Sequence, residues 1–168
     1  MKCKITDCLK ETVGKSKYCA AHRSEAHARW KEMIGEKAEE RKAQQDCFRI
    51  LYEEAHSAGM SAGGSHVPQP MVVEQHENPI DDNSPVEKRW YVPEGLCGFA
   101  WINVRPGTCA FARWAVREKL ARKAYGGGIE FWVSEFNQSV EKKEKYARAF
   151  AEVLRKHGVT AYPGSRLD

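Results

Sequence analysis

Apolar and polar residues alternate in three short stretches of the C-terminal half of the chain, and helical periodicity fills the two intervals between them. Pro106-Gly107 ends the first stretch as a turn, and Gly158 caps the second helix. Pro163-Gly164 closes the third stretch. The expected elements, in the order strand, helix, strand, helix, strand, are residues 97–105, 109–124, 129–133, 140–156 and 159–162. This order predicts a small βαβαβ module with short right-handed crossovers and both helices on one face of the sheet.

The same alternation separates the two faces of the predicted sheet, because successive side chains of a strand point to opposite sides. One face is apolar and is expected to lie against the helices; its residues are Ala100, Ile102, Val104, Ile129, Phe131, Val133, Val159 and Ala161. The opposite face is aromatic and polar together; its residues are Phe99, Trp101, Asn103, Arg105, Glu130, Trp132, Ser134, Thr160 and Tyr162.

Two interpretations of the aromatic face stay open. Parallel strands are usually covered on both sides, so the preceding long helix, residues 90–92 or a second subunit would bury it. Alternatively, the face binds a ligand, because exposed aromatic rings beside Arg and Asn are typical of surfaces that stack unpaired bases. Each stacked base contributes on the order of 1–3 kcal/mol without requiring sequence specificity.

A long helix and a linker are expected upstream of this module. Residues 24–57 contain no proline, a single glycine and many good helix formers, with apolar residues gathered only near the two ends. Such a helix is typical of a strut or a partner-binding rod. Residues 58–88 are rich in Gly, Ser, Pro and acidic residues and contain one short apolar run at 71–73, which predicts a flexible acidic linker between separate modules.

The first 23 residues contain a possible metal site. The spacing C-x4-C-x10-C-x2-H supplies two ligand pairs separated by a loop, which is how a short chain usually builds a tetrahedral zinc site. The expected ligands are Cys3, Cys8, Cys19 and His22. The first pair is expected on a tight turn and the second on the first turn of a helix. Four protein ligands leave no position for water, so the site is interpreted as structural and not catalytic.

The composition of the whole chain agrees with a folded cytoplasmic protein. Of its 168 residues, 42% are hydrophobic and 30% are charged, and no apolar run reaches the roughly 20 residues of a membrane span. Met1 and the residues after it lack the apolar core of a signal peptide. In a reducing compartment, the six cysteines are better interpreted as metal ligands or free thiols than as disulfides.

Charge is unevenly distributed along the chain. Residues 1–23 carry a formal charge of +4 and residues 89–168 carry +6, whereas the intervening residues 24–88 carry −6. Two basic ends around an acidic middle favour contact with a polyanion at the ends.

The stretch CKITDCLKETVGKSKYCAAHR resembles the short three-Cys, one-His zinc fingers of bacterial and bacteriophage proteins, which often occur with HNH-type nucleases or other DNA-associated functions. The matching residues are Cys3, Cys8, Tyr18, Cys19, His22 and Arg23. The resemblance implies a structural zinc ion, nucleic-acid contact and a phage or prophage origin. No His-Asn-His arrangement of a nuclease follows, since His76-Glu77-Asn78 falls in the expected linker. Residues 89–168 resemble no family.

These observations divide the chain into a zinc finger (residues 1–23), a long helix (24–57), a linker (58–88) and a small α/β module (89–168). The leading hypothesis is a non-enzymatic, zinc-stabilised nucleic-acid-binding accessory protein, with either single strands or duplex as ligand. The expected contact residues are Lys15, Lys17, Arg23, Trp101, Asn103, Arg105, Trp132 and Tyr162. The alternative is a protein-interaction factor that inhibits or modulates a host enzyme or defence system. An enzyme is the least favoured class, because no catalytic set of side chains emerges.

Overall fold

The computed structural model describes residues 2–12 and 14–168. The chain forms two compact units, Met1–Asp46 and Cys47–Asp168, and each is described by itself. Helix α1 (Ala20–Ser65) begins in the first unit and ends in the second. Among the described residues, no helix combines the length and the apolar character needed to cross a bilayer.

The second unit is built around a four-stranded antiparallel sheet with the strand order β4-β5-β3-β6. Its elements, in chain order, are β3 (Gly98–Val104), α2 (Ala110–Arg117), β4 (Arg122–Lys123), β5 (Ile129–Trp132), α3 (Val140–Lys156) and β6 (Ala161–Leu167). The order β-α-β-β-α-β with a strand inserted between each crossover pair is the split βαβ arrangement. The long strand β3 lies in the middle of the sheet and therefore determines what both faces present.

The expected βαβαβ order with parallel neighbours is wrong, and the reason lies in the second expected element. Helix α2 stops at Arg117 instead of continuing to residue 124, and Lys119 adopts a positive φ of 61°. The backbone N–H of Leu120 then donates to the carbonyl of Ala115, which turns the chain out of the helix. The released residues pair as β4 with β5, so every neighbouring pair in the sheet is antiparallel.

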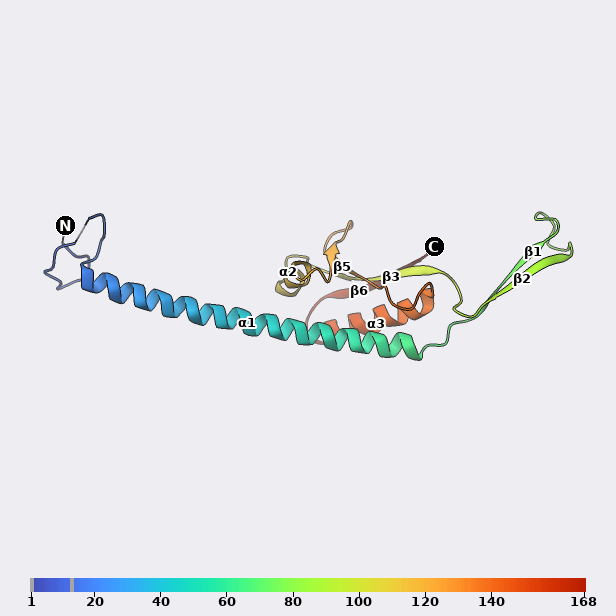
Figure 1. The fold of residues 1–168 in the computed structure, drawn as a ribbon, viewed down its shortest axis with the longest axis horizontal. Coiled ribbons are helices and arrows are strands. Elements are labelled where there is room, and N and C mark those ends of the chain that lie inside the picture. Colours follow the sequence, from blue (N-terminus) through green and yellow to red (C-terminus); the bar gives the residue numbers. More distant parts are fainter. Residues whose placement is uncertain (1, 13) are drawn as a thin grey trace. The chain divides into compact units, whose positions relative to one another are not determined.

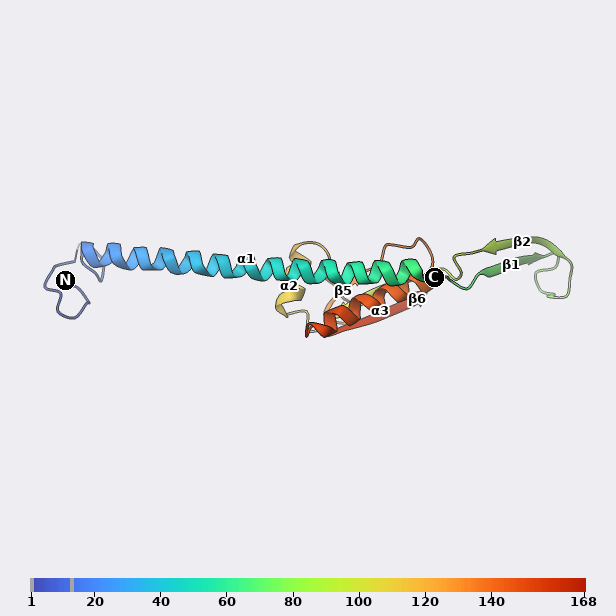
Figure 2. The same cartoon turned by 90° about the horizontal axis from the view of Figure 1, so that it is seen from below.

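The apolar face of the sheet is buried under helices, as the alternation predicted. Ala100, Ile102 and Val104 are fully buried, and Phe131 contacts the rings of Tyr52 from α1 and Phe150 from α3. In the second unit, α3 and the C-terminal part of α1 lie on the same side of the sheet and run side by side (Figures 1 and 2). Because α1 adds to the helical layer on the apolar face, it does not cover the aromatic face.

Helix α1 extends eight residues into the segment expected to be linker, through a stretch that contains three glycines. Gly59 and Gly63 are one turn apart and face α3 and the loop before it: a Cβ at Gly59 would lie 2.7 Å from the Tyr146 ring, and one at Gly63 would lie 2.5 Å from Phe136. The close approach of the two elements offsets the low helix propensity of glycine.

The remainder of the expected linker contains a hairpin of β1 (Met71–His76) and β2 (Val86–Val92). β-Branched and aromatic side chains pair across it, with Val73 opposite Trp90 and Val72 opposite Tyr91. Asx turns at Asn78 and Asp81 organise the connection. This segment therefore contains regular secondary structure that the linker prediction did not include.

Strand β6 also differs from its prediction, since it runs from Ala161 to Leu167 through the Pro163-Gly164 pair that was expected to end it. Proline is compatible with this position because β6 is an edge strand, where a missing backbone N–H can face solvent. The extension adds Gly164 and Arg166 to the aromatic face.

Candidate metal centre and open sheet face

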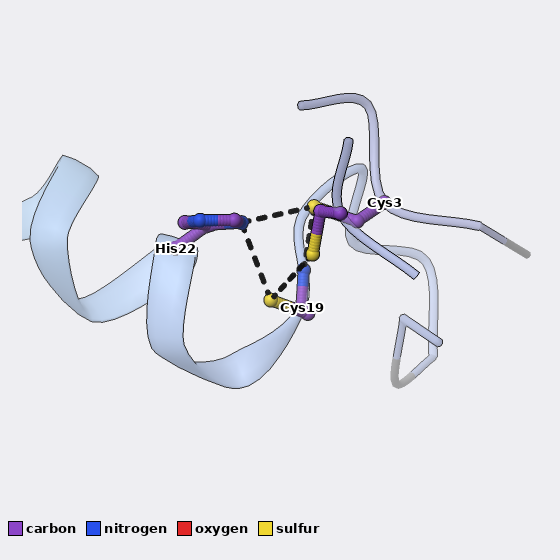
Figure 3. A group of neighbouring side chains, drawn as sticks. Cys3, Cys19 and His22 are labelled. Atoms are coloured by element: carbon purple, nitrogen blue, oxygen red, sulfur yellow. Dashed lines mark hydrogen bonds between the residues drawn. The ribbon is translucent and has the colours of Figure 1, made fainter. Parts of the chain in front are cut away.

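The four residues expected to bind zinc lie together in the first unit. One donor atom from each of Cys3, Cys8, Cys19 and His22 lies within 4.8 Å of the others. His22 Nδ1 is 3.4 Å from Cys3 Sγ and 3.5 Å from Cys19 Sγ, and Cys8 Sγ is 3.8 Å from Cys19 Sγ. Figure 3 shows the Cys3 and Cys19 side chains and the His22 ring converging on one point. The cluster can hold a metal ion.

Three of the separations between donor atoms match tetrahedral coordination. With metal–sulfur bonds of about 2.3 Å and metal–nitrogen bonds of about 2.0–2.1 Å, a tetrahedral zinc site places sulfurs about 3.8 Å apart and sulfur and nitrogen about 3.6 Å apart. The two sulfur–nitrogen separations and the sulfur–sulfur separation of the cluster lie within about 0.2 Å of these values. The donor set is therefore of a size that fits a four-coordinate ion.

Local backbone structure explains why these side chains converge. The N–H of Cys8 donates to the carbonyl of Ile5, and Asp7 takes a positive φ of 67°, which forms the tight turn expected between the first two ligands. Cys19 directly precedes α1, and His22 lies in its first turn, so their side chains share one face of the helix. The N–H of Cys19 donates to Cys3 Sγ over 3.4 Å and joins the two ligand pairs.

Hydrogen bonding and crowding distribute charge unequally among the thiols. The backbone N–H groups of Cys19 and Ile5 lower the pKa of Cys3 to about 6, because they stabilise its thiolate. The backbone N–H of Lys10 favours the Cys8 thiolate, but desolvation and the neighbouring Cys19 thiol outweigh it and raise the pKa of Cys8. The Cys3 thiolate therefore forms readily, whereas the Cys8 thiolate is disfavoured unless a cation lies beside it.

The basic residues predicted near the metal site are all exposed. Lys15 and Lys17 lie in the loop before α1, and Arg23 lies in the first turns of α1. Arg23 lines a hollow of about 410 Å³ together with Tyr18 and His27. These three cations are therefore accessible to solvent, and they lie in the same unit as the metal cluster.

The aromatic face of the sheet is open to solvent, and we call it the open sheet face. It consists of Phe99, Trp101, Asn103, Arg105, Arg122, Glu130, Trp132, Tyr162, Gly164 and Arg166. Trp132 is 39% exposed and Tyr162 is 55% exposed, and Arg105 is exposed as well. Of the two interpretations made from sequence, burial within this chain is wrong.

The rings of the open sheet face are ordered by one another and by cations. Trp101 and Trp132 lie opposite each other on β3 and β5, with ring centroids 6.0 Å apart and planes within 7° of parallel. The Arg122 guanidinium lies 4.9 Å from the centre of the Trp132 ring. At the other end of the face, the Arg166 guanidinium lies 5.3 Å from the centre of the Phe99 ring. These cation–π contacts hold planar side chains in place at the surface.

Arg105 and Asn103 are held by the loop that follows β4. Arg105 Nε donates to Asn103 Oδ1 over 2.8 Å, and Arg105 Nη2 donates to the carbonyl of Gly126 over 2.9 Å. Asn103 Nδ2 donates to the carbonyl of Gly127 over 3.2 Å. Gly128 has a φ of 80°, and a Cβ there would collide with the carbonyl of Val104, so the loop approaches β3 as only glycine allows.

Sequence reasoning missed three residues of the open sheet face. The sequence predicts a helix at Arg122, and it predicts that the last strand ends before Gly164 and Arg166. The alternation of Tyr162, Gly164 and Arg166 was the available signal, because it continues the period of two through the proline. No comparable signal marked Arg122, whose strand has only two residues.

Comparisons of this chain with models of known protein families, with characterised proteins and with solved structures find no match.

Proposed function

We propose that this chain binds single-stranded nucleic acid on the open sheet face, and that a structural zinc ion in the Cys3-Cys8-Cys19-His22 cluster folds a basic N-terminal segment that adds phosphate contacts. The observation that carries the proposal is the exposed combination of parallel Trp101 and Trp132 rings with positioned arginines.

The architecture favours unpaired bases over a duplex. Four-stranded antiparallel sheets that carry aromatic residues on one uncovered face bind RNA by stacking two or three bases on those rings. Here Trp101 and Trp132 lie on β3 and β5, the two central strands of the sheet, and helices cover the other face. The second unit shares with those sheets only its physical arrangement. The proposed function therefore depends on the exposed side chains and not on the fold.

The charge of the open sheet face is also suitable for a polyanion. Arg105, Arg122 and Arg166 project from it, against the single carboxylate of Glu130. Arg122 Nε lies 2.7 Å from Glu130 Oε1, so this carboxylate is already neutralised by a partner. The surplus of guanidinium groups beside aromatic rings supports backbone contact together with base stacking.

Oligonucleotide binding tests the proposal. Fluorescently labelled single strands and duplexes of equal length are titrated with the full chain across a salt series. We expect low-micromolar binding that prefers single strands and weakens as salt rises, because phosphate contacts release counterions. Trp132→Ala should weaken binding about tenfold, as expected for the loss of one stacked base. Trp90→Ala in the hairpin is the matched control, because Trp90 is similarly exposed at 46%. Absence of salt-dependent binding would overturn the proposal.

Metal analysis tests the zinc assignment separately. The purified chain should contain one zinc per molecule, and Cys19→Ser should lose it, because one sulfur of a four-ligand set is removed. Cys47→Ser is the control, since Cys47 is an exposed cysteine outside the cluster. Wild-type protein that holds no zinc after reconstitution would contradict the assignment. A Cys19→Ser variant that retains as much zinc as wild type would contradict it as well.

A further inference from the structure

A hollow of about 620 Å³ lies at one end of the open sheet face, between β3, β6 and the loop after β4. We propose that it seats one unpaired nucleotide, with its phosphate on Arg105 and the amino edge of its base on Glu130. This inference rests on the proposed function and adds a base preference to it: cytosine, adenine or guanine over thymine or uracil. The volume falls within the range of about 300–1,000 Å³ that is usual for small-molecule sites.

Aromatic walls make the hollow suitable for a planar ligand. Trp101 and Tyr162 both line it, from β3 and β6 respectively. Gly164 allows the Trp101 indole to lie across β6, because a Cβ at Gly164 would be 2.7 Å from the indole Cε2 and Nε1 atoms. The indole therefore lies against the strand backbone, and Tyr162 projects from the same strand two residues away on the same face.

Arg105 is positioned for a phosphate. Its bonds to Asn103 Oδ1 and to the Gly126 carbonyl use two of the five N–H groups of the guanidinium and fix the plane of the group. Three N–H donors remain for a ligand. An arginine ordered before binding loses less side-chain entropy when a phosphate arrives, so it contributes more affinity than a mobile surface cation.

Glu130 supplies the base preference. It lines the hollow and lies opposite Asn103 in the sheet. Its side chain is half-buried, and its Oε1 accepts from Arg122 Nε. A carboxylate has about four acceptor sites, so Glu130 retains capacity to accept from a ligand. The exocyclic amino group of cytosine, adenine or guanine is such a donor, and glutamate recognises cytosine N4 in this way. Thymine and uracil lack the amino group, and their carbonyl oxygens repel a carboxylate.

The test compares oligo(dC) and oligo(dT) of eight nucleotides, measured by fluorescence anisotropy at pH 7.5 with wild type and two matched variants. Wild type should bind oligo(dC) about tenfold more tightly than oligo(dT), the discrimination expected of a good base contact. Glu130→Gln should reduce this ratio to near one, because the amide can donate to thymine as well as accept from cytosine. Glu152→Gln is the control: it also removes one carboxylate from an ion pair, but on an exposed position of α3. This variant should keep the wild-type ratio.

The Arg105→Gln variant tests the proposed phosphate contact independently of the base preference. It should weaken both oligonucleotides equally and reduce the slope of log affinity against log salt by about one, the signature of one lost phosphate contact. Equal binding of oligo(dC) and oligo(dT) by wild type, or an unchanged ratio in Glu130→Gln, would overturn the nucleotide seat while leaving single-strand binding intact. If the wild type showed no salt-dependent binding to either oligonucleotide, both proposals would be overturned.

Discussion

Glu141 joins the helical layer of the second unit to the segment that leads into the hairpin. His66 Nε2 lies 2.9 Å from Glu141 Oε2, and the backbone N–H of Gln69 donates to both carboxylate oxygens. The His66 hydrogen bond, aided by the Gln69 N–H and the charge of Lys145, lowers the pKa of Glu141. The charged form of Glu141 is thus the one that the folded protein stabilises.

This shift predicts a stability difference that depends on pH. A carboxyl group whose pKa is lowered on folding stabilises the native state above its ordinary pKa of about 4.3, and the contribution is lost as pH falls through the lowered value. Glu141→Gln should therefore melt at a lower temperature than wild type at pH 7, and the two melting temperatures should converge between about pH 5 and pH 3. Calorimetry across this range checks the expectation. A difference that stays constant with pH would show that the Glu141 charge contributes nothing.

Among the elements, the C-terminal part of α1 is the one whose extent depends most on its neighbours. Residues 58–65 have the composition of a linker, yet they stay helical where Gly59 and Gly63 meet Tyr146 and Phe136. Tyr146 is buried, and its hydroxyl lies 2.6 Å from His56 Nδ1 one turn further back on α1. Desolvation raises the pKa of Tyr146, so the hydroxyl remains protonated and shares a hydrogen bond with His56.

The adjacent glycines of this segment should respond oppositely to alanine. Gly63→Ala introduces a Cβ 2.5 Å from the Phe136 ring and 2.9 Å from the carbonyl of Lys142, so we expect destabilisation of about 1–3 kcal/mol. Gly64→Ala meets nothing within 4 Å and should be neutral or stabilising by about 0.5 kcal/mol, because alanine is the better helix former. Urea unfolding followed by tryptophan fluorescence measures both changes. Equal effects of the two substitutions would mean that α1 does not approach α3 this closely.

The two units of the molecule differ in the interactions that stabilise them. The second unit has a continuous core that includes Ile102, Phe131 and Phe150, whereas among the described residues of the first unit the buried apolar side chains are Cys3 and Cys19, both members of the candidate metal cluster. A segment with so little apolar burial requires a cross-link to fold, and a structural zinc ion can provide it.

Chelation should therefore affect the two units differently. Removal of metal with a strong chelator is expected to abolish the exchange protection of the Cys3 and Lys4 amides, which donate to the carbonyls of Lys10 and Lys17. The thermal transition of the second unit should stay unchanged, and added zinc should restore protection. Hydrogen exchange read by mass spectrometry, together with calorimetry, distinguishes the two responses. Protection that survives chelation would show that the first unit folds without metal.

Local patterns were sufficient for several parts of this molecule. Residues 140–156 were predicted as a helix and form α3 with the same bounds, because its apolar residues recur at helical spacing and a glycine follows it. Ligand spacing predicted the cluster of Cys3, Cys8, Cys19 and His22, since a tight turn and one helical turn suffice to bring each pair together. The period of two in residues 99–104 likewise determined which side of β3 is buried.

Backbone conformations and contacts that the local pattern of residues does not reveal decided the remainder. The sheet is antiparallel because α2 ends early and releases β4, and that ending depends on a non-glycine residue, Lys119, in a left-handed conformation. Helix α1 continues through glycines because α3 packs against them. The aromatic face is open because α1 joins α3 in the helical layer on the apolar side of the sheet. Amino-acid order alone determined which residues share a face, and long-range association determined which face meets water.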